Sequence, residues 1–213
     1  MASISYPVIG VDESGKGDFF GPLVIAGCLV EEEQLDRLAE IGVRDSKKIA
    51  NAKLLRLADQ IKSVCCYDIV AINPEKYNEL YDRIKNLNKL LGWGHARVIE
   101  NILSKQPAPT AISDKFGADH FIRSNLQKQG RSIELIQMVR GEAQPPVAAA
   151  SILARAEFLH RMDSLSKQTE WELPRGAGSI VDDAARQLVN RSGAGILDKI
   201  AKRHFKNYKK VLC

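Results

Sequence analysis

Four carboxylate side chains follow apolar segments of the chain, at the points where β-strands are expected to end. Asp12 and Glu13 close YPVIGVDE, Asp114 closes PTAISD, and Glu142 follows SIELIQMV. In α/β sheets, ligand sites lie beyond the carboxyl ends of the strands, where distant parts of the chain meet. Carboxylates gathered in one place repel each other unless they are protonated or share a cation, and oxygen ligands suit Mg2+ or Mn2+. The spacing therefore predicts a shared site for divalent metal, although acids at strand ends also serve as plain turn or cap residues.

Other common catalytic and metal-binding patterns are absent from the sequence. The four histidines show no HExxH or other paired spacing, and neither a GxSxG elbow nor a Walker A loop occurs. The four cysteines, Cys28, Cys65, Cys66 and Cys213, contain no CxxC pair. This argues against a disulfide framework and against a zinc ribbon. We therefore expect reduced thiols and a cytoplasmic location, and we interpret a lone histidine as a packing or surface residue.

The hydrophobic pattern predicts strands that alternate with helices after an opening hairpin. Glycines in GKGDFFGP allow the chain to turn between YPVIGVDESG and FFGPLVIAGCLV, and Asn73-Pro74 supplies an N-cap and a first-turn proline for a helix. Further strands are expected at 64–72, in PTAISD and at 132–139, and helices at about 51–63, 74–84, 87–104, from Pro145 onward, 180–190 and 193–210. The predicted fold class is α/β, a mixed β-sheet flanked by helices with a helical C-terminal extension.

Length and charge limit the function classes further. The chain has 213 residues, 45% of them hydrophobic, and a formal net charge of +5. This length favours one compact domain, residues 1–170, with a helical region, 171–213, packed on it. No apolar run is long enough to span a membrane, and the N-terminus lacks the pattern of a signal peptide. Segment 199–213 carries six Lys or Arg and no acid, which suits a polyanionic partner but also a solvated helix face.

Several motifs, in a fixed order, resemble one enzyme family. IGVDESGKGDFFGPLVIAG resembles the opening hairpin of type 2 ribonucleases H, and DESGKGDFFGPL is similar to the ribonuclease HIII branch. RDSKKI, VAAASILAR, LPRGAGSIVDDAARQL and AKRHFK resemble further segments of that branch, so the resemblance covers nearly the whole chain. It implies a ribonuclease H-like catalytic domain. Ribonuclease HIII usually also carries an N-terminal substrate-binding domain resembling the TATA-binding protein. Here the catalytic motif begins at once, so either this member lacks that domain or these 213 residues leave it out.

The resemblance also assigns roles to individual positions. The family's four catalytic and metal-binding acids fall on Asp12, Glu13, Asp114 and Glu142, and the glutamate at the fourth position is typical of the HIII branch. The remaining positions implied to bind substrate form two groups. They are Gly15, Lys16 and Gly17 of the glycine loop that contacts the ribose, and Ser46, Lys47 and Lys48 of a phosphate-contacting segment. A glycine loop can itself approach a ribose closely, because glycine has no side chain.

The activity implied by the resemblance is endonucleolytic hydrolysis of the RNA strand of an RNA–DNA hybrid duplex. The four acids would bind two divalent ions, Mg2+ or Mn2+, and cleavage would leave 3′-hydroxyl and 5′-phosphate ends. We expect a monomer. A non-catalytic nucleic-acid-binding module would not need four converging acids, and a recombinase of the same superfamily should lack DESGKG. The other alternative is incision at single ribonucleotides, as in ribonuclease HII, but LPRGAG stands where that enzyme has its GYP-type tyrosine motif.

Overall fold

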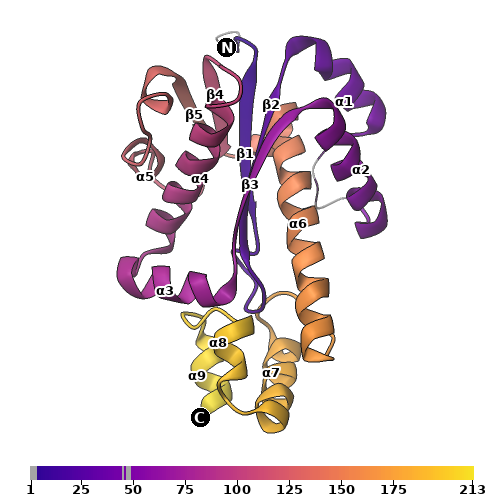
Figure 1. Ribbon diagram of the computed structural model, residues 1–213, viewed down its shortest axis with the longest axis vertical. Helices are drawn as coiled ribbons and strands as arrows, with labels where there is room; N and C mark the ends of the chain where they lie inside the picture. Colours follow the sequence, from indigo (N-terminus) through magenta and orange to yellow (C-terminus); the bar gives the residue numbers. More distant parts are fainter. Residues whose placement is uncertain (1–3, 45, 47–48) are drawn as a thin grey trace. The chain divides into compact units, whose positions relative to one another are not determined.

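Five strands form the sheet that carries the candidate acids. The computed structural model describes residues 4–44, 46 and 49–213. The strand order is β3-β2-β1-β4-β5 (Figure 1). The strands are β1 (Val8–Ser14), β2 (Leu23–Val30), β3 (Cys66–Ile72), β4 (Thr110–Asp114) and β5 (Glu134–Met138). β4 pairs in parallel with both β1 and β5, so the carboxyl ends of β1, β4 and β5 lie at the same edge.

Two helices pack tightly on the sheet because glycines in the strands leave room for them. A Cβ on Gly10 of β1 would lie 2.0 Å from the carbonyl carbon of Pro146, in the first turn of α6 (Pro145–Thr169). A Cβ on Gly27 of β2 would lie 2.4 Å from Val98 of α4 (Leu87–Leu103). A side chain at Gly10 would require a backbone shift, and one at Gly27 would displace the side chain of Val98. Figure 1 shows α4 and the start of α6 on opposite sides of the sheet.

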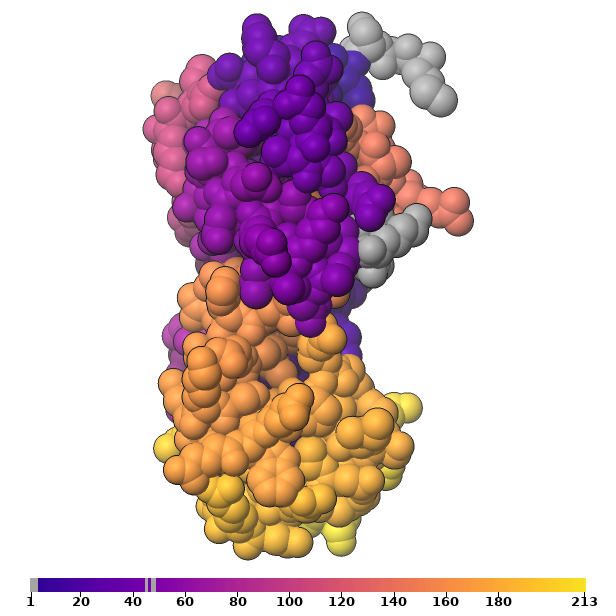
Figure 2. Space-filling view, turned by 90° about the vertical axis from the view of Figure 1, so that its right-hand side faces the viewer, coloured from indigo at the N-terminus to yellow at the C-terminus, as the bar shows by residue number. Residues whose placement is uncertain are grey.

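The remaining elements are helical. They are α1 (Leu35–Ile41), α2 (Asn51–Val64), α3 (Pro74–Ile84), α5 (His120–Arg123), α7 (Ser179–Ser192), α8 (Ile196–Ile200), α9 (Lys206–Leu212) and the short 3-10 helices η1 (Glu32–Gln34), η3 (Gly130–Ser132) and η4 (Gly141–Ala143). In Figure 2 the segment of α1 and α2, in purple, lies on the surface that is turned to the viewer. The structure thus confirms the mixed sheet with flanking helices, while α1 and α5 were not anticipated.

The predicted helix at 193–210 is wrong in its middle. The chain forms two short helices there, and residues 201–205 between them are not helical. Ala201 pairs with Phe20 as an isolated antiparallel bridge, and the Lys202 N–H donates to the carbonyl of Phe19 at 2.9 Å. These hydrogen bonds to residues after the first strand replace the helical ones, which interrupts the helix.

The predicted start of α3 at Pro74 is confirmed, but the expected hydrogen bond to the N-cap side chain is not formed. Asn73 occupies the N-cap position and makes no capping hydrogen bond with its side chain. Its Oδ1 accepts a hydrogen bond from Nη1 of Arg161 at 3.0 Å. Long-range pairing therefore takes the oxygen that the local motif would use. Among the described residues, no helix is both long and apolar enough to cross a membrane.

The chain divides into two compact units, and each contains segments that are far apart in sequence. The first comprises the residues up to Glu13, Ile25–Val70 and Leu87–Ala156. The second comprises Ser14–Val24, Ala71–Asn86 and Glu157–Cys213. The region 171–213 therefore shares its unit with the loop after the first strand and with α3. All four candidate acids belong to the first unit, and the glycine loop belongs to the second.

Candidate active site

Asp12 and Asp114 come from neighbouring strands of the first unit. Val11 of β1 pairs with Ser113 of β4 in a parallel register. The next residue on each strand is a candidate acid, at the edge where these parallel strands end. Side chains at matched positions of neighbouring strands lie on the same face of a sheet. The structure thus places Asp12 and Asp114 at adjacent positions of neighbouring strands, with their side chains on one face of the sheet.

The turn after β5 is fastened to one of these acids. The Gly141 N–H donates to Oδ1 of Asp114 at 2.8 Å. A Cβ on Gly141 would lie 3.1 Å from the Asp114 Cα, so a larger residue would push the turn away. Glu142, the next residue, is partly exposed. A backbone hydrogen bond therefore carries the fourth candidate acid to the carboxyl end of β4.

The Asp12 carboxylate is held by hydroxyl and backbone donors on its side of the sheet. Ser151 of α6 donates to it, and the Glu13 N–H reaches Asp12 Oδ1 at 2.8 Å. Ser151 Oγ lies 2.8 Å from Ser46 Oγ. Burial, and then the negative charge of Glu13, raise the pKa of Asp12 to about 6, and these donors oppose the shift. The site thus concentrates negative charge that its own donors compensate only in part.

Glu13 is held by a different group of side chains, on a helix and a neighbouring strand. Its Oε2 lies 3.1 Å from Nε2 of His95, and His95 Nδ1 lies 3.0 Å from Ser113 Oγ. His95, on α4, is completely buried. Adjacent residues of a strand point to opposite faces, which explains why Asp12 and Glu13 have separate partners. Sequence reasoning interpreted a lone histidine as packing and missed this link, because no motif joins His95 to the acids.

The donor set suits a hard divalent cation. All four candidates supply carboxylate oxygens, which Mg2+ and Mn2+ prefer, and the raised pKa of Asp12 indicates charge that a cation would neutralise. Within residues 4–44, 46 and 49–213, however, no three Asp, Glu, His or Cys side chains form a ready metal site. The backbone brings Asp12, Asp114 and the Glu142 turn to one edge, and Glu13 is engaged by His95.

In the glycine loop of the second unit, one position has a backbone conformation that only glycine adopts readily. Gly15 has a φ of +86°, and a Cβ there would lie 2.2 Å from the Pro22 carbonyl oxygen and 2.9 Å from the Phe158 ring. At Gly17 a Cβ would meet nothing within 4 Å. Gly15 is therefore required by packing, whereas Gly17 leaves an open surface beside the partly buried Lys16.

A buried lysine holds the residues that follow this loop. The side chain of Lys202 is fully buried, and its Nζ donates to the carbonyl oxygens of Asp18, Phe20 and Gly21 at 2.7, 3.4 and 2.7 Å. Burial lowers the pKa of Lys202 to about 7, and the Asp18 carboxylate opposes this shift. Three acceptors match the three N–H groups of an ammonium ion, so the buried charge has its hydrogen bonds satisfied.

The segment that the family resemblance assigns to phosphate contacts lies only partly within the described residues. Lys47 and Lys48 lie outside the described residues. Ser46 is buried, and its hydroxyl is engaged by Ser151. Its carbonyl oxygen accepts a hydrogen bond from Arg155, whose Nη2 also reaches Asn51 Oδ1 at 2.9 Å. Ser46 therefore belongs to the support of Asp12 in this structure.

The basic C-terminal segment contains cations of two kinds. Lys202 is buried, Arg203 pairs with Asp82, and Lys210 pairs with the buried Asp182. The remaining three, Lys199, Lys206 and Lys209, are exposed, and the structure gives them no partner among the described residues. Half of the basic residues in this segment thus have structural roles that the charge pattern alone did not reveal.

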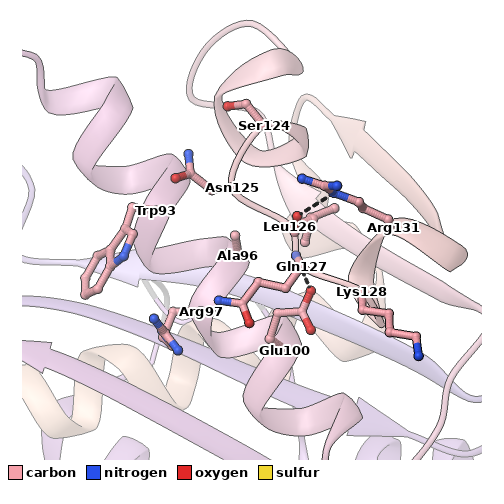
Figure 3. A pocket seen from close by; sticks show the side chains of 10 residues that line it. All are labelled: Trp93, Ala96, Arg97, Glu100, Ser124, Asn125, Leu126, Gln127, Lys128 and Arg131. Carbon is pink, nitrogen blue, oxygen red and sulfur yellow. Dashed lines mark hydrogen bonds between the residues drawn. The ribbon is translucent and has the colours of Figure 1, made fainter.

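A cavity in the first unit has none of the candidate acids in its lining. It has a volume of about 660 Å3 and lies between α4 and the segment around α5 and η3 (Figure 3). Glu100 lies in its wall, and its Oε1 accepts the N–H groups of Gln127 and Gly130 at 2.6 and 2.9 Å. The nearby Arg131 Nε donates to the Leu126 carbonyl at 2.9 Å. These polar groups hold the 126–131 loop.

Comparison with known proteins gives a consistent result. Residues 9–208 match the family model of ribonuclease HII. Ribonuclease HIII of Protochlamydia amoebophila is 43% identical over 206 residues, which cover 97% of this chain and 68% of the relative. Ribonuclease HIII of Chlamydia pneumoniae is 46% identical over 208 residues, which cover 96% of this chain and 70% of the relative.

Solved structures share the fold. Bst-RNase HIII in complex with Mn2+ is 32% identical with a TM-score of 0.90, over 96% of this chain and 68% of that one. RNase HII of Archaeoglobus fulgidus, from a complex with PCNA, is 25% identical with a TM-score of 0.79, over 96% of both chains. These likenesses confirm the expected ribonuclease H-like sheet with flanking helices. The chain belongs to the ribonuclease HII family, and it is similar to members of that family named ribonuclease HIII.

Proposed function

We propose that this chain is an endoribonuclease that hydrolyses the RNA strand of RNA–DNA hybrids, leaving 3′-hydroxyl and 5′-phosphate ends. The main support is the backbone arrangement at one end of the sheet, where Asp12 and Asp114 follow paired positions of two parallel strands and Glu142 lies on the turn that hydrogen bonds to Asp114. Family membership favours this activity over that of a non-catalytic nucleic-acid-binding module. A cytoplasmic location and a monomeric state are part of the same proposal.

Asp12, Glu13, Asp114 and Glu142 would hold the divalent metal, Mg2+ or Mn2+, as two ions. When bound, such ions make water a better nucleophile and stabilise the departing oxygen. Ser151 orients Asp12, and His95 orients Glu13 through its Nε2. Carboxylate ligands that are already hydrogen bonded need less reordering when a cation arrives.

Residues other than the four acids would distinguish RNA from DNA and hold the substrate. The ribose 2′-OH distinguishes RNA from DNA, and the loop of Gly15, Lys16 and Gly17 is our candidate for contacting it. Its open face at Gly17 supports this role, because no side chain would stand between the backbone and a ribose. In the segment of Ser46, Lys47 and Lys48, the two lysines would make the charged contacts with the phosphate backbone, and the buried Ser46 would anchor the segment beside Ser151.

The deciding experiment compares three end-labelled duplexes: an all-RNA strand on DNA, a single ribonucleotide in DNA, and DNA only. We expect efficient cleavage of the first and none of the third. Cleavage of the second should be slower by roughly 30- to 150-fold, because two or three missing 2′-OH contacts each cost about 1 kcal/mol. Equal rates on the first two would instead favour incision at single ribonucleotides, as in ribonuclease HII. Against that alternative, the Tyr208 hydroxyl is engaged, since it donates to Asp198 Oδ1 at 3.0 Å.

Metal dependence is tested on the same hybrid. Excess chelator should abolish cleavage, and Mg2+ or Mn2+ should restore it, because water is a poor nucleophile at neutral pH without a metal ion. Undiminished cleavage in chelator would contradict the metal-dependent mechanism. Titrating each ion separately would measure which one the protein uses better.

A further inference from the structure

A second cavity of the first unit contains one of the candidate acids together with two arginines. Its volume is about 430 Å3, within the range of small-ligand pockets. Arg44, Arg140 and Glu142 are the charged residues of its lining, and Val43, Ala143 and Pro145 are among the apolar ones. Both arginines are exposed. The cavity therefore combines two guanidinium groups with a carboxylate assigned to the reaction.

Arg140 has a backbone conformation that is unusual for a residue with a side chain. Its φ is +60° and its ψ is +44°, in the left-handed region where glycine is favoured. The turn needs this conformation, because the Arg140 carbonyl accepts the Ala143 N–H at 3.1 Å while the Gly141 N–H binds Asp114. Glycine would occupy the position with less strain. A long cation there suggests that the side chain has a task beyond shaping the turn.

The two arginines are also uncommitted within the molecule. In the described ranges neither Arg44 nor Arg140 makes an ion pair or a hydrogen bond with its side chain. Arg155, Arg161 and Arg203, in contrast, each bond to protein groups. The chain around residue 140 projects from the surface in Figure 2, and the neighbouring Val139 is 76% exposed. The guanidinium groups are thus accessible to a partner from solution.

We propose that Arg44 and Arg140 form a phosphate-binding site that holds one phosphodiester group of the nucleic acid next to Glu142. The inference rests on the proposed function and adds two residues to it. A polyanion that approaches the carboxylates is repelled by them, and two cations beside Glu142 offset that repulsion. Guanidinium groups suit the task because they bind phosphate oxygens through paired N–H donors and remain charged at any working pH. A phosphate contact positions the strand and reads no sequence.

The test uses the full chain and four variants: Arg44→Ala, Arg140→Gly, Arg140→Lys and Lys128→Ala. Arg140→Gly removes the guanidinium but fits the left-handed turn, so the position of Glu142 should be kept. Lys128→Ala removes one exposed cation from the wall of the cavity in Figure 3 and is the control of matched charge. The probe is a fluorescent RNA–DNA hybrid, and its Kd is measured by anisotropy in chelator at several salt concentrations, so that binding is read without cleavage.

We expect Arg44→Ala and Arg140→Gly each to raise the Kd about tenfold and to reduce the slope of log Kd against log salt by roughly one unit or less. Arg140→Lys should retain most of the binding, and Lys128→Ala should match the unchanged protein. Melting temperatures of Arg140→Gly and the unchanged protein should agree or favour the variant. Kd and slope unchanged in both arginine variants would overturn the site, as would an equal loss in Lys128→Ala.

A different result would contradict the proposed function and leave the phosphate site untouched: the unchanged protein binds the hybrid but does not cleave it with Mg2+ or Mn2+. In that case the effect of the arginine variants on Kd still decides whether the phosphate site exists. If Arg140→Gly lowers kcat on the hybrid while Kd and salt slope stay unchanged, Arg140 acts only through the turn, and the proposal is wrong.

Discussion

Charged groups are treated differently in the two units. At the acid site of the first unit, Asp12 and Glu13 are adjacent carboxylates, and burial and repulsion raise the pKa of Asp12 to about 6. In the second unit the buried Lys202 meets three carbonyl oxygens, and the buried Asp182 is bonded to Asn207 and Lys210. The second unit thus completes the bonding of its buried charges, whereas the first leaves negative charge incompletely compensated.

This difference has a functional meaning. A buried charge whose hydrogen-bond partners the fold supplies has little capacity left for a ligand, although its desolvation still costs folding free energy, as the lowered pKa of Lys202 indicates. A charge with too few partners costs folding free energy and can bind what the protein lacks, such as a cation. Substitutions should therefore separate the two regions, with loss of activity from one and loss of stability from the other.

The largest effect is expected at the acid site. Asp12→Asn, Glu13→Gln, Asp114→Asn and Glu142→Gln keep side-chain size but remove charge, and each should slow hybrid cleavage by about 100-fold or more. Glu134→Gln, an exposed carboxylate on β5, is the control and should retain activity. If Glu142→Gln retained near-normal activity while Glu157→Gln lost it, the fourth acid would be wrongly assigned. Glu157 pairs with Arg161 in the structure, which favours a structural role.

The same Asp12→Asn variant should be more stable than the unchanged protein when both are free of metal. Because the folded pKa of Asp12 is raised, the folded state binds more protons than the unfolded state between about pH 4 and pH 6, so stability falls as the pH rises through this window. At pH 7 the variant should gain up to about 3 kcal/mol. Urea unfolding at pH 4, 6 and 7.5 measures this gain, and equal stabilities at pH 7.5 would contradict it.

Lys202→Met is expected to have a smaller effect, which is a loss of folding stability. The substitution removes the ammonium donor from the carbonyl oxygens of Asp18, Phe20 and Gly21, at a cost of about 2 kcal/mol or more. Because the folded pKa of Lys202 is lowered to about 7, the unfolded state binds more protons above that pH, and the stability of the unchanged protein should rise from pH 7 toward pH 10. The variant should lack this contribution. Urea midpoints at three pH values check both points, with the exposed Lys199→Met as control.

The smallest effects are expected from the lysines of α9, and they should differ between the exposed lysines and the one that pairs with Asp182. Lys206→Ala with Lys209→Ala removes exposed charges and should raise KM a few-fold and flatten its salt dependence, by roughly one unit or less for each phosphate that is no longer bound. Lys210→Ala should leave the salt dependence unchanged and lower stability by about 1 kcal/mol or more, because it removes the cation that pairs with buried Asp182. An unchanged salt slope in the double variant would show that these lysines do not touch the substrate.

The sequence by itself determined the strands, most of the helices and the positions of the four acids. Strand and helix patterns are local, so hydrophobic spacing located β4, β5 and α2–α4 within a few residues. Each acid follows such a pattern, so the convergence of Asp12 and Asp114 needed only the rule that parallel strands end at one edge. The family resemblance rested on motifs that are also contiguous in the chain.

Only the tertiary structure decided which partners these groups have. His95 forms a hydrogen bond with Glu13, 82 positions away in the chain, and Ser46 forms one with Ser151, 105 positions away. Lys202 donates hydrogen bonds to carbonyl oxygens of residues 18–21, up to 184 positions away. No local pattern encodes such pairs, because a hydrogen bond depends on where two backbones lie in space. For the same reason the bonds of Ala201 and Lys202 to residues 19–21 overrode a helical pattern at 193–210, since satisfying buried polar groups outweighs the small helix preference of a few residues.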